Sequence, residues 1–335
     1  MLEDINTLGG MVETVKLPEP QQKIHDGKPF PLILSPTDQK TFTDLPSTIM
    51  WLEENRDKLK KILLKYGVIV FRDFPVKKAI DFDAFVKALD YQPFPYIGGA
   101  APRTSVVGDV FTTNESPPDK LVDFHHEIAQ SPKYPKNIFF FCEYPAKEGG
   151  QTSVAPSNLV YRKMLEREPE FVKDLEEKGV RYLRVLPDGD DNESAIGRGW
   201  QSTYLSKTRE EAESKAKELG TTFEWMPDGS VKTITDIMPG VRINPNNGLK
   251  MWHNAIINAY RAYVDSRNVP EKSVYLSDGT YMKPEVMDIL DETLCECASD
   301  MDWKSGDVMM IDNLQVLHAR REFVPPRRVL AWLCV

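Results

Sequence analysis

Hydrophobic residues recur at helical spacing between residues 45 and 66. The apolar positions of this segment are Ile49, Leu52, Leu59, Ile62 and Leu63. Such spacing is typical of a helix that buries one face. Gly67 follows at a position where helices often end, and residues 68–71 are a short β-branched and apolar run. The pattern therefore predicts a helix, a glycine C-cap and a buried strand.

Short strands dominate the rest of the predicted secondary structure. Runs of β-branched and aromatic residues predict strands at residues 104–112, 137–144, 180–186, 221–225, 231–235, 241–244, 250–253, 307–312 and 327–333. Helical periodicity predicts helices at residues 79–89, 157–179 (interrupted near Pro169), 208–219 and 284–298. The many short strands, together with 25 prolines, favour a mainly β protein with flanking helices and a jelly-roll, cupin-like core.

The first 45 residues are rich in proline and polar side chains and show no clear period. They predict an irregular lead-in, of which residues 1–17 form a flexible N-terminal arm. No linker divides the remaining chain into two cores. Residues 1–335 are therefore expected to form a single domain.

The charge balance argues against several partners. The chain has 42 Lys and Arg against 51 Asp and Glu, a formal net charge of −9. This balance disfavours nucleic acid and an anionic membrane surface. No apolar run approaches the about 18 residues of a membrane span, and the N-terminal residues do not resemble a signal or transit peptide. We expect a cytoplasmic protein that acts on a small molecule.

A histidine and a carboxylate stand two residues apart in His125-His126-Glu127. In extended backbone, residues i and i+2 point to the same side, so His125 and Glu127 can chelate one ion while His126 points away. Of the chain's five histidines, His318 is in the best setting for a third ligand, because it follows a buried strand and a turn. Two histidines and one carboxylate leave open positions on a metal, as in non-heme Fe(II) oxygenases. Zinc, or an exposed pair without a metal, remains an alternative.

An arginine near the C-terminus suggests a site for an anion. Strand alternation puts Arg328, Leu330 and Trp332 on one face and Arg327 on the other. If the first face is the barrel interior, Arg328 needs an anionic partner there. A guanidinium binds a carboxylate through two parallel hydrogen bonds, and the distal carboxylate of 2-oxoglutarate fits this requirement. Thr152 supplies a hydroxyl for the same carboxylate.

These motifs as a set resemble the taurine dioxygenase/clavaminate synthase-like family of Fe(II)/2-oxoglutarate-dependent oxygenases. The matching positions are His125-X-Glu127, Gly150-Gln151-Thr152, Gly306-Asp307, Asp312-Asn313, His318 and Arg328. Residues 98–104, 114–118 and 196–200 are similar to plant clavaminate synthase-like proteins, and the resemblance runs from about Pro18 to the C-terminus. It implies that His125, Glu127 and His318 bind iron, and that Thr152 and Arg328 bind 2-oxoglutarate.

Two positions depart from the pattern of many relatives. Glu127 replaces the usual aspartate, as it also does in the clavaminate synthase branch, so the carboxylate has a longer reach. Trp332 stands where the taurine branch has a second arginine, which disfavours substrates that need that arginine. Candidate substrate contacts are Asn114, Arg103, Arg198 and Trp252.

The sequence thus predicts a double-stranded β-helix dioxygenase that uses Fe(II), 2-oxoglutarate and O2. The expected reaction oxidises an unactivated C–H bond of a small carboxylate- or amino-acid-like metabolite, by hydroxylation, desaturation or oxidative cyclisation, and releases succinate and CO2. Two alternatives stay open. The protein could be a non-catalytic metal-binding barrel that acts as a binding module, or an oxygenase of protein side chains.

Overall fold

The predicted helix and strand near the N-terminus are confirmed in a computed structural model of the chain, which describes residues 2–38, 40–99, 101–113, 116–194 and 196–335. The helices, with one 3₁₀ turn, are α1 (Leu2–Asn6), α2 (Leu45–Tyr66), α3 (Ala79–Ala88), α4 (Ser157–Arg167), α5 (Pro169–Lys178), α6 (Trp200–Tyr204), α7 (Arg209–Glu218), α8 (Ile256–Ala262), η1 (Pro270–Lys272) and α9 (Pro284–Cys297). Asp44 caps α2 by accepting a hydrogen bond from Ser47 N, and Gly67, at φ 76°, ends the helix.

Two sheets form the centre of the molecule. The large sheet has the order β1 (Val12–Thr14), β4 (Leu32–Pro36), β5 (Val68–Phe71), β19 (Val308–Asp312), β9 (Asn137–Tyr144), β22 (Arg328–Cys334), β7 (Val110–Thr112) and β6 (Ser105–Val107). The small sheet has the order β18 (Ser299–Met301), β11 (Thr152–Pro156), β20 (Val316–Arg320) and β8 (Val122–His125). Apart from the parallel pair β4–β5, neighbouring strands in both sheets are antiparallel.

The remaining strands lie outside these two sheets. A third sheet contains β13 (Thr221–Trp225), β14 (Val231–Thr235), β12 (Val180–Leu186) and β17 (Val274–Leu276). Two-stranded pairs are β2 (Lys23–His25) with β3 (Lys28–Phe30), β10 (Glu148–Gly149) with β21 (Phe323–Val324), and β15 (Arg242–Ile243) with β16 (Lys250–Met251). Together these elements confirm a mainly β protein with flanking helices.

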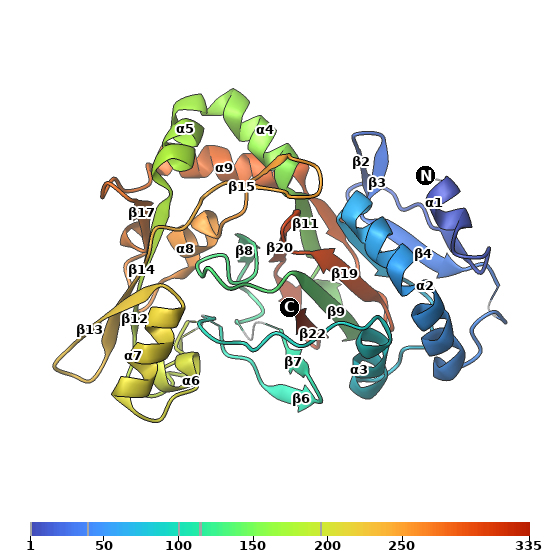
Figure 1. Ribbon diagram of the computed structural model, residues 1–335, viewed down its shortest axis with the longest axis horizontal. Helices are drawn as coiled ribbons and strands as arrows, with labels where there is room; N and C mark the ends of the chain where they lie inside the picture. The colour runs from blue at the N-terminus through green and yellow to red at the C-terminus, as the bar shows by residue number, and fades with distance from the viewer. Residues whose placement is uncertain (1, 39, 100, 114–115, 195) are drawn as a thin grey trace.

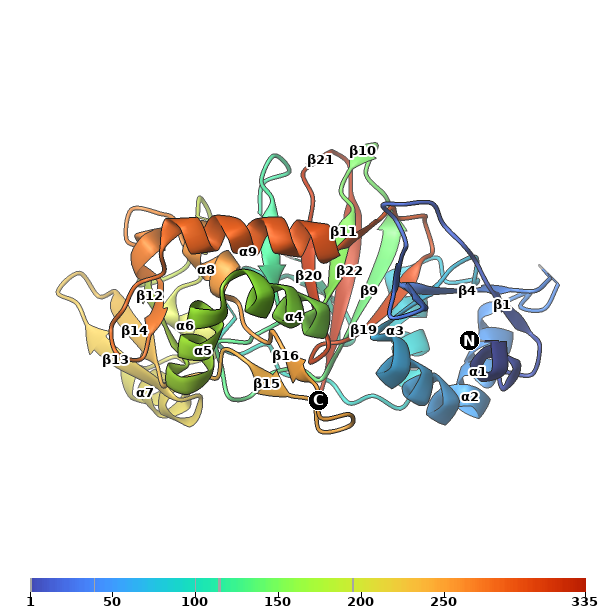
Figure 2. The ribbon, with the colours of Figure 1, turned by 90° about the horizontal axis from the view of Figure 1, so that it is seen from above.

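Side chains of alternating direction build a layered core. Residues from β5, β9, β19 and β22 meet residues from β11, β18 and β20 in one buried cluster between the two central sheets. The other face of the large sheet packs against α1, α2 and α3, and α4, α5, α8 and α9 cover the small sheet. Figures 1 and 2 show these helix groups on opposite sides of the central strands.

The N-terminal residues are more ordered than the sequence pattern suggests. Within residues 1–17, predicted to be a flexible arm, β1 pairs with β4. Ile5, Leu8 and Val12 are buried in the cluster beneath α2. These paired strands show that the prediction of an irregular lead-in for residues 1–45 is wrong. The sequence did not indicate β1 to β4 because such short strands carry too few residues to show a period.

The single strand predicted at residues 104–112 is also wrong. The structure has two strands there, β6 and β7, that pair with each other. Gly108 lies in the turn between them with φ 54°. A Cβ on this glycine would lie 2.6 Å from Asp83 Oδ2, so both the backbone angle and the space favour glycine.

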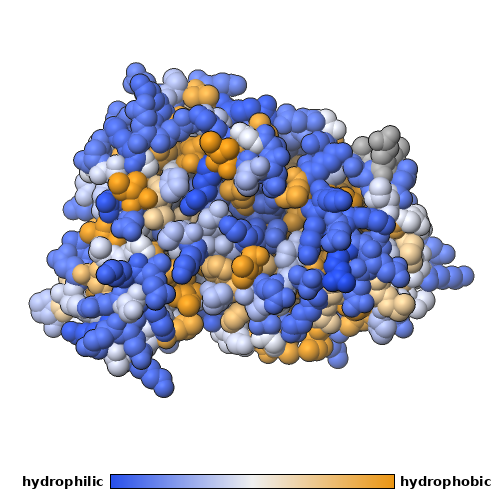
Figure 3. Space-filling model, in the orientation of Figure 1, coloured by the Kyte–Doolittle hydropathy of each residue, from blue (hydrophilic) through white to orange (hydrophobic). Residues whose placement is uncertain are grey.

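Most of the face in Figure 3 is hydrophilic, with hydrophobic residues scattered over it. Across the described residues, every helix is too short or too polar to span a bilayer.

A buried ion pair joins two neighbouring strands of the large sheet. Arg72, directly after β5, donates from Nε and Nη2 to the Asp307 carboxylate, and the shortest contact is 2.6 Å. Both residues are almost fully buried, at 2% and 1% exposure. Removing one partner of such a pair leaves an uncompensated buried charge.

We predict that Arg72→Met lowers the free energy of unfolding by about 3–5 kcal/mol, as is typical when one partner of a buried pair is lost. Chemical denaturation followed by circular dichroism measures the change. The matched control is Arg56→Met, which removes an exposed pair with Asp90 at 3.6 Å and should cost less than about 1 kcal/mol. Equal losses for the two variants would contradict the prediction.

Candidate metal centre

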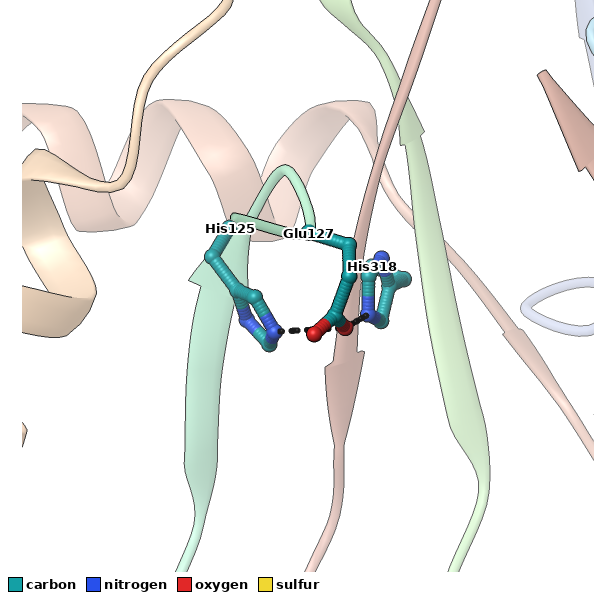
Figure 4. Close-up of side chains that lie close together, drawn as sticks. All are labelled: His125, Glu127 and His318. Carbon is teal, nitrogen blue, oxygen red and sulfur yellow. Dashed lines mark ion pairs between the residues drawn. The ribbon is translucent and has the colours of Figure 1, made fainter. Parts of the chain in front are cut away.

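Two neighbouring strands bring the predicted ligands together. β8 and β20 pair in antiparallel register with His125 opposite His318, although these residues are 193 positions apart in the chain. Glu127 follows in the turn after β8, where Ile128 has φ 55°. In Figure 4 the three side chains converge on one point from β8, the turn and β20.

The distances in this cluster suit one metal ion. Glu127 Oε2 lies 3.9 Å from His125 Nε2 and 3.6 Å from His318 Nε2. One ligand atom from each residue lies within 4.8 Å of the others. Glu127 Oε2 is buried and has no hydrogen-bond partner among the residues that the structure describes. A metal between these atoms would satisfy that oxygen, so the residues present fit the ion that the sequence predicts.

The electrostatics set the charge of His125 and of Glu127. Burial, together with the neighbouring His318, lowers the pKa of His125 to about 4. Burial alone would raise the pKa of Glu127, but the Arg103 guanidinium and the two imidazoles hold it well below its usual range. His125 is therefore neutral and Glu127 ionised near neutral pH, as metal binding requires.

The backbone of the ligand turn is held by Asn313, which sequence reasoning did not assign to the site. Asn313 is fully buried. Its Oδ1 accepts a hydrogen bond from Glu127 N at 2.9 Å, and its Nδ2 donates to Glu127 O at 3.1 Å and to Pro135 O at 2.7 Å. The Asp312-Asn313 turn after a buried strand is the sequence signal that could have identified it.

His126 points away from the ligand cluster, as predicted. It is fully buried, and its ring nitrogens lie within hydrogen-bond distance of Asn313 O and Trp252 O. The Trp252 side chain, a predicted substrate contact, is 1% exposed and packs in the cluster beneath α4 and α5. It is not among the residues that line the two cavities described below.

Two cavities meet at His125 and Glu127, and His318 lines one of them. The cavity that we call the Thr152 cavity is lined by Arg103, Thr113, Val122, His125, Glu127, Phe140, Thr152, His318, Ala319, Arg320, Arg327 and Val329. The cavity that we call the Tyr96 cavity has Arg103, Val122, His125 and Glu127 in common with it and extends to Tyr96, Ile196, Asn258 and Tyr263. The ligand cluster therefore lies between two spaces that could hold different molecules.

The predicted position of Arg328 is wrong. Its side chain is 41% exposed and its Nε pairs with Glu143 Oε2 at 2.9 Å. Arg327 lines the Thr152 cavity instead. Arg328, Leu330 and Trp332 do lie on one face, but this face of β22 points to α2 and α3, as the buried Leu330 and Trp332 show. Both faces of β22 are buried, so alternation alone could not tell which face lines the cavity.

Thr152 and two further arginines lie at the Thr152 cavity. Thr152 begins β11, is 5% exposed, and accepts a hydrogen bond from Trp303 Nε1 at 3.0 Å. Arg320 is buried and donates to the backbone oxygens of Ser116, Pro117 and Lys120. Burial, together with the neighbouring Arg320, lowers the pKa of Arg327 to about 10.

Of the predicted substrate contacts Arg103, Arg198 and Asn114, only Arg103 is found among the described residues that line the cavities. Arg103 lines both cavities and donates from Nη2 to Glu127 Oε1 at 2.9 Å. Arg198 is 7% exposed and donates to Gly99 O at 3.0 Å; it does not line either cavity but lies 5.0 Å from the Tyr96 ring. Asn114 lies outside the described residues.

Two histidines and one carboxylate beside two cavities have the ligand arrangement of non-heme Fe(II) oxygenases. The sequence profile of the taurine catabolism dioxygenase TauD, TfdA family matches residues 34–334. The chain therefore belongs to this family, and it is an Fe(II)/2-oxoglutarate-dependent dioxygenase.

Relatives and solved structures agree with this assignment. A clavaminate synthase-like protein of Arabidopsis thaliana is 44% identical over 327 residues, which cover 96% of this chain and 98% of that protein. The dapdiamide synthesis protein DdaC of Enterobacter agglomerans is 26% identical over 283 residues, covering 81% and 83% of the two chains. The fold resembles that of a taurine dioxygenase from Burkholderia xenovorans, with a TM-score of 0.51, 15% identity and coverage of 97% and 89%.

We predict that His125→Ala and His318→Ala each weaken Mn(II) binding by more than about 100-fold, beyond the 10–100-fold that outer-shell changes cost. Titration calorimetry under anaerobic conditions measures the affinity. His25→Ala is the control, since His25 lies in β2 outside the cluster. Unchanged Mn(II) affinity in both ligand variants would refute the assignment.

Proposed function

We propose that His125, Glu127 and His318 would hold Fe(II), which would supply the O2 chemistry by which the protein oxidises a C–H bond of a small, carboxylate-bearing metabolite. The observation that supports this most directly is the buried Glu127 Oε2, which faces both imidazoles and lacks a partner in the described chain. In the net reaction, one oxygen atom of O2 enters succinate. The other enters the substrate as C–OH, or leaves as water with two substrate hydrogens in desaturation or ring closure. 2-Oxoglutarate is converted to succinate and CO2.

The two central sheets support a finer description of the fold. We propose that the large sheet and the small sheet together form a double-stranded β-helix, with the iron ligands at one end of the small sheet. The shared core of alternating residues between the sheets supports this description. β8 and β20 then contribute the ligands because they are paired strands of the small sheet.

The Thr152 cavity is the proposed binding site of 2-oxoglutarate. Arg327 lines this cavity, and no ion pair joins it to a carboxylate of the described residues. Its Nε donates to Gly150 O at 3.0 Å, which fixes the direction of the guanidinium. Arg327 is partly buried, and a cation withdrawn from water without an anionic neighbour is costly. The distal carboxylate of 2-oxoglutarate is therefore its natural partner, with Thr152 beside it.

The Tyr96 cavity is the proposed substrate site. Val122 and Ile196 line it with apolar surface that excludes water, and Asn258 offers an amide. Arg103 lines it as well, and its Nε and Nη1 have no hydrogen-bond partner within the described ranges. This lining supports a substrate that combines an apolar portion with an anionic group.

Two more buried arginines add positive charge behind this cavity. Arg184 and Arg198 are each 7% exposed, and the side chains of Tyr263 and Tyr96 lie between them and the cavity. In the described part of the chain, neither forms an ion pair with a carboxylate. The potential from these two guanidinium groups, which no carboxylate of the described residues neutralises, favours an acid such as an amino acid over a neutral or cationic substrate.

The assignment of the 2-oxoglutarate site predicts that substitutions of two adjacent arginines affect 2-oxoglutarate binding to very different extents. Arg327→Gln should weaken 2-oxoglutarate binding by about 30-fold or more, the cost of truncating one partner of a buried charge pair. Arg328→Gln is the matched control and should change it less than about 3-fold, because Arg328 is exposed. Anaerobic titration of the Fe(II) protein, read by its charge-transfer absorption, measures both. A larger effect for Arg328→Gln would contradict the assignment.

The proposed substrate class predicts that acids, and not their neutral analogues, stimulate turnover. The L-amino acids and other small carboxylic acids are each compared with the corresponding primary amide, in the presence of Fe(II), 2-oxoglutarate and ascorbate. Succinate release above the substrate-free rate is the measurement, and it should be abolished by His125→Ala. Stimulation by amides equal to that by acids would show that an anionic group is not required.

A further inference from the structure

The two oxygens of the Glu127 carboxylate have different surroundings. Oε1 accepts a hydrogen bond from Arg103 Nη2 at 2.9 Å. Oε2 has no such partner among the described residues and is the oxygen that lies 3.9 Å and 3.6 Å from the Nε2 atoms of His125 and His318. Oε1 is thus engaged in a hydrogen bond within the protein, and Oε2 faces the proposed position of the metal.

This difference matters because a carboxylate can bind a metal through one oxygen or through both. The proposed reaction needs three open positions on the iron, two for 2-oxoglutarate and one for O2. A glutamate that bound through both oxygens would use one of these positions. The longer side chain of glutamate, compared with aspartate, has an extra rotatable bond, so its carboxylate orientation needs additional control.

Arg103 is well placed to supply that control. The side chains of Arg103 and Glu127 are each 6% exposed, and a hydrogen bond between opposite charges is stronger than a neutral one. The guanidinium lies over the Tyr96 ring at 4.4 Å, and the Tyr96 hydroxyl donates to Ala101 O at 3.2 Å. The ring therefore restricts the position of the guanidinium.

The other end of Glu127 is held independently. Asn313 bonds both the N–H and the C=O of Glu127, so the turn cannot move toward the metal without breaking two buried hydrogen bonds. With the backbone and Oε1 both held, only Oε2 is free to approach an ion between the imidazoles.

We infer that Arg103 is a positioning residue that keeps Glu127 a one-oxygen ligand and so preserves the third open position on the metal. This inference rests on the proposed function, since it needs His125, Glu127 and His318 to be the metal ligands. It assigns to Arg103 a role through Glu127, separate from any contact that its other nitrogens make with substrate.

The test counts the water molecules on the metal in the absence of 2-oxoglutarate. Mn(II) replaces Fe(II) as the probe, and the broadening of its electron paramagnetic resonance lines by ¹⁷O-water reports the number of bound waters. A six-coordinate ion with three single-oxygen or single-nitrogen protein ligands has three waters. We expect three waters in the wild-type protein and two in Arg103→Met, because Oε1 is then free to bind the metal.

Two further variants separate this role from loss of charge or loss of folding. Arg198→Met removes a buried guanidinium that also lies beside Tyr96 but does not touch Glu127, and it should keep three waters. Arg103→Gln keeps a polar side chain that is too short to reach Oε1, and it should have two waters even if Arg103→Met does not fold. Three waters in either folded Arg103 variant, or two in Arg198→Met, would overturn the inference.

Mn(II) binding by the wild-type protein and by His125→Ala distinguishes a failure of this inference from a failure of the proposed function. If the wild-type protein does not bind Mn(II), or if His125→Ala binds it equally well, then the metal site itself is wrongly assigned. If the wild-type protein binds Mn(II) and His125→Ala does not, the water counts judge the role of Arg103 alone.

Discussion

A buried carboxylate between two imidazoles is the constraint on which this site depends. Taking an ionised Glu127 out of water is costly, and the cost is met only if positive or hydrogen-bonding groups surround it. Arg103 compensates the charge on one side, Asn313 satisfies the backbone, and the metal site lies on the remaining side. The pairing of β8 with β20 is what makes this possible, because it puts His318 directly opposite His125.

The layered core holds the strands of this site in place from outside the site. The large sheet packs on one face against α1 to α3 and on the other against the small sheet, so the strands that carry the ligands are held from behind. The hairpin from β19 to β20 carries Asn313 and then His318 within six residues. One turn therefore fixes both the backbone of Glu127 and the position of the third ligand, which couples the geometry of the two ligand segments.

Much of this could be predicted from the sequence, for identifiable physical reasons. The helix at residues 45–66 has a strong period and clear caps, and the strand at residues 137–144 is a long apolar run; both are confirmed. The three proposed ligand residues stand out because their residue types and spacing are typical of metal chemistry. These side chains could therefore be named as candidate ligands before their geometry was known.

The sequence could not predict which way individual side chains point. β22 is buried on both faces, so its alternation places Arg328 with Leu330 and Trp332 without saying which face meets the cavity; the structure puts Arg327 there. The burial of Trp252 could not be predicted either, because burial of a single residue in a loop leaves no period in the sequence. Arg103 differs again: its contact with Glu127 joins residues 24 positions apart and depends on where Tyr96 lies. Sequence motifs identify the candidate metal ligands. Long-range packing determines which oxygen of Glu127 can bind the metal, and in our proposal this sets the number of coordination positions that stay open for 2-oxoglutarate and O2.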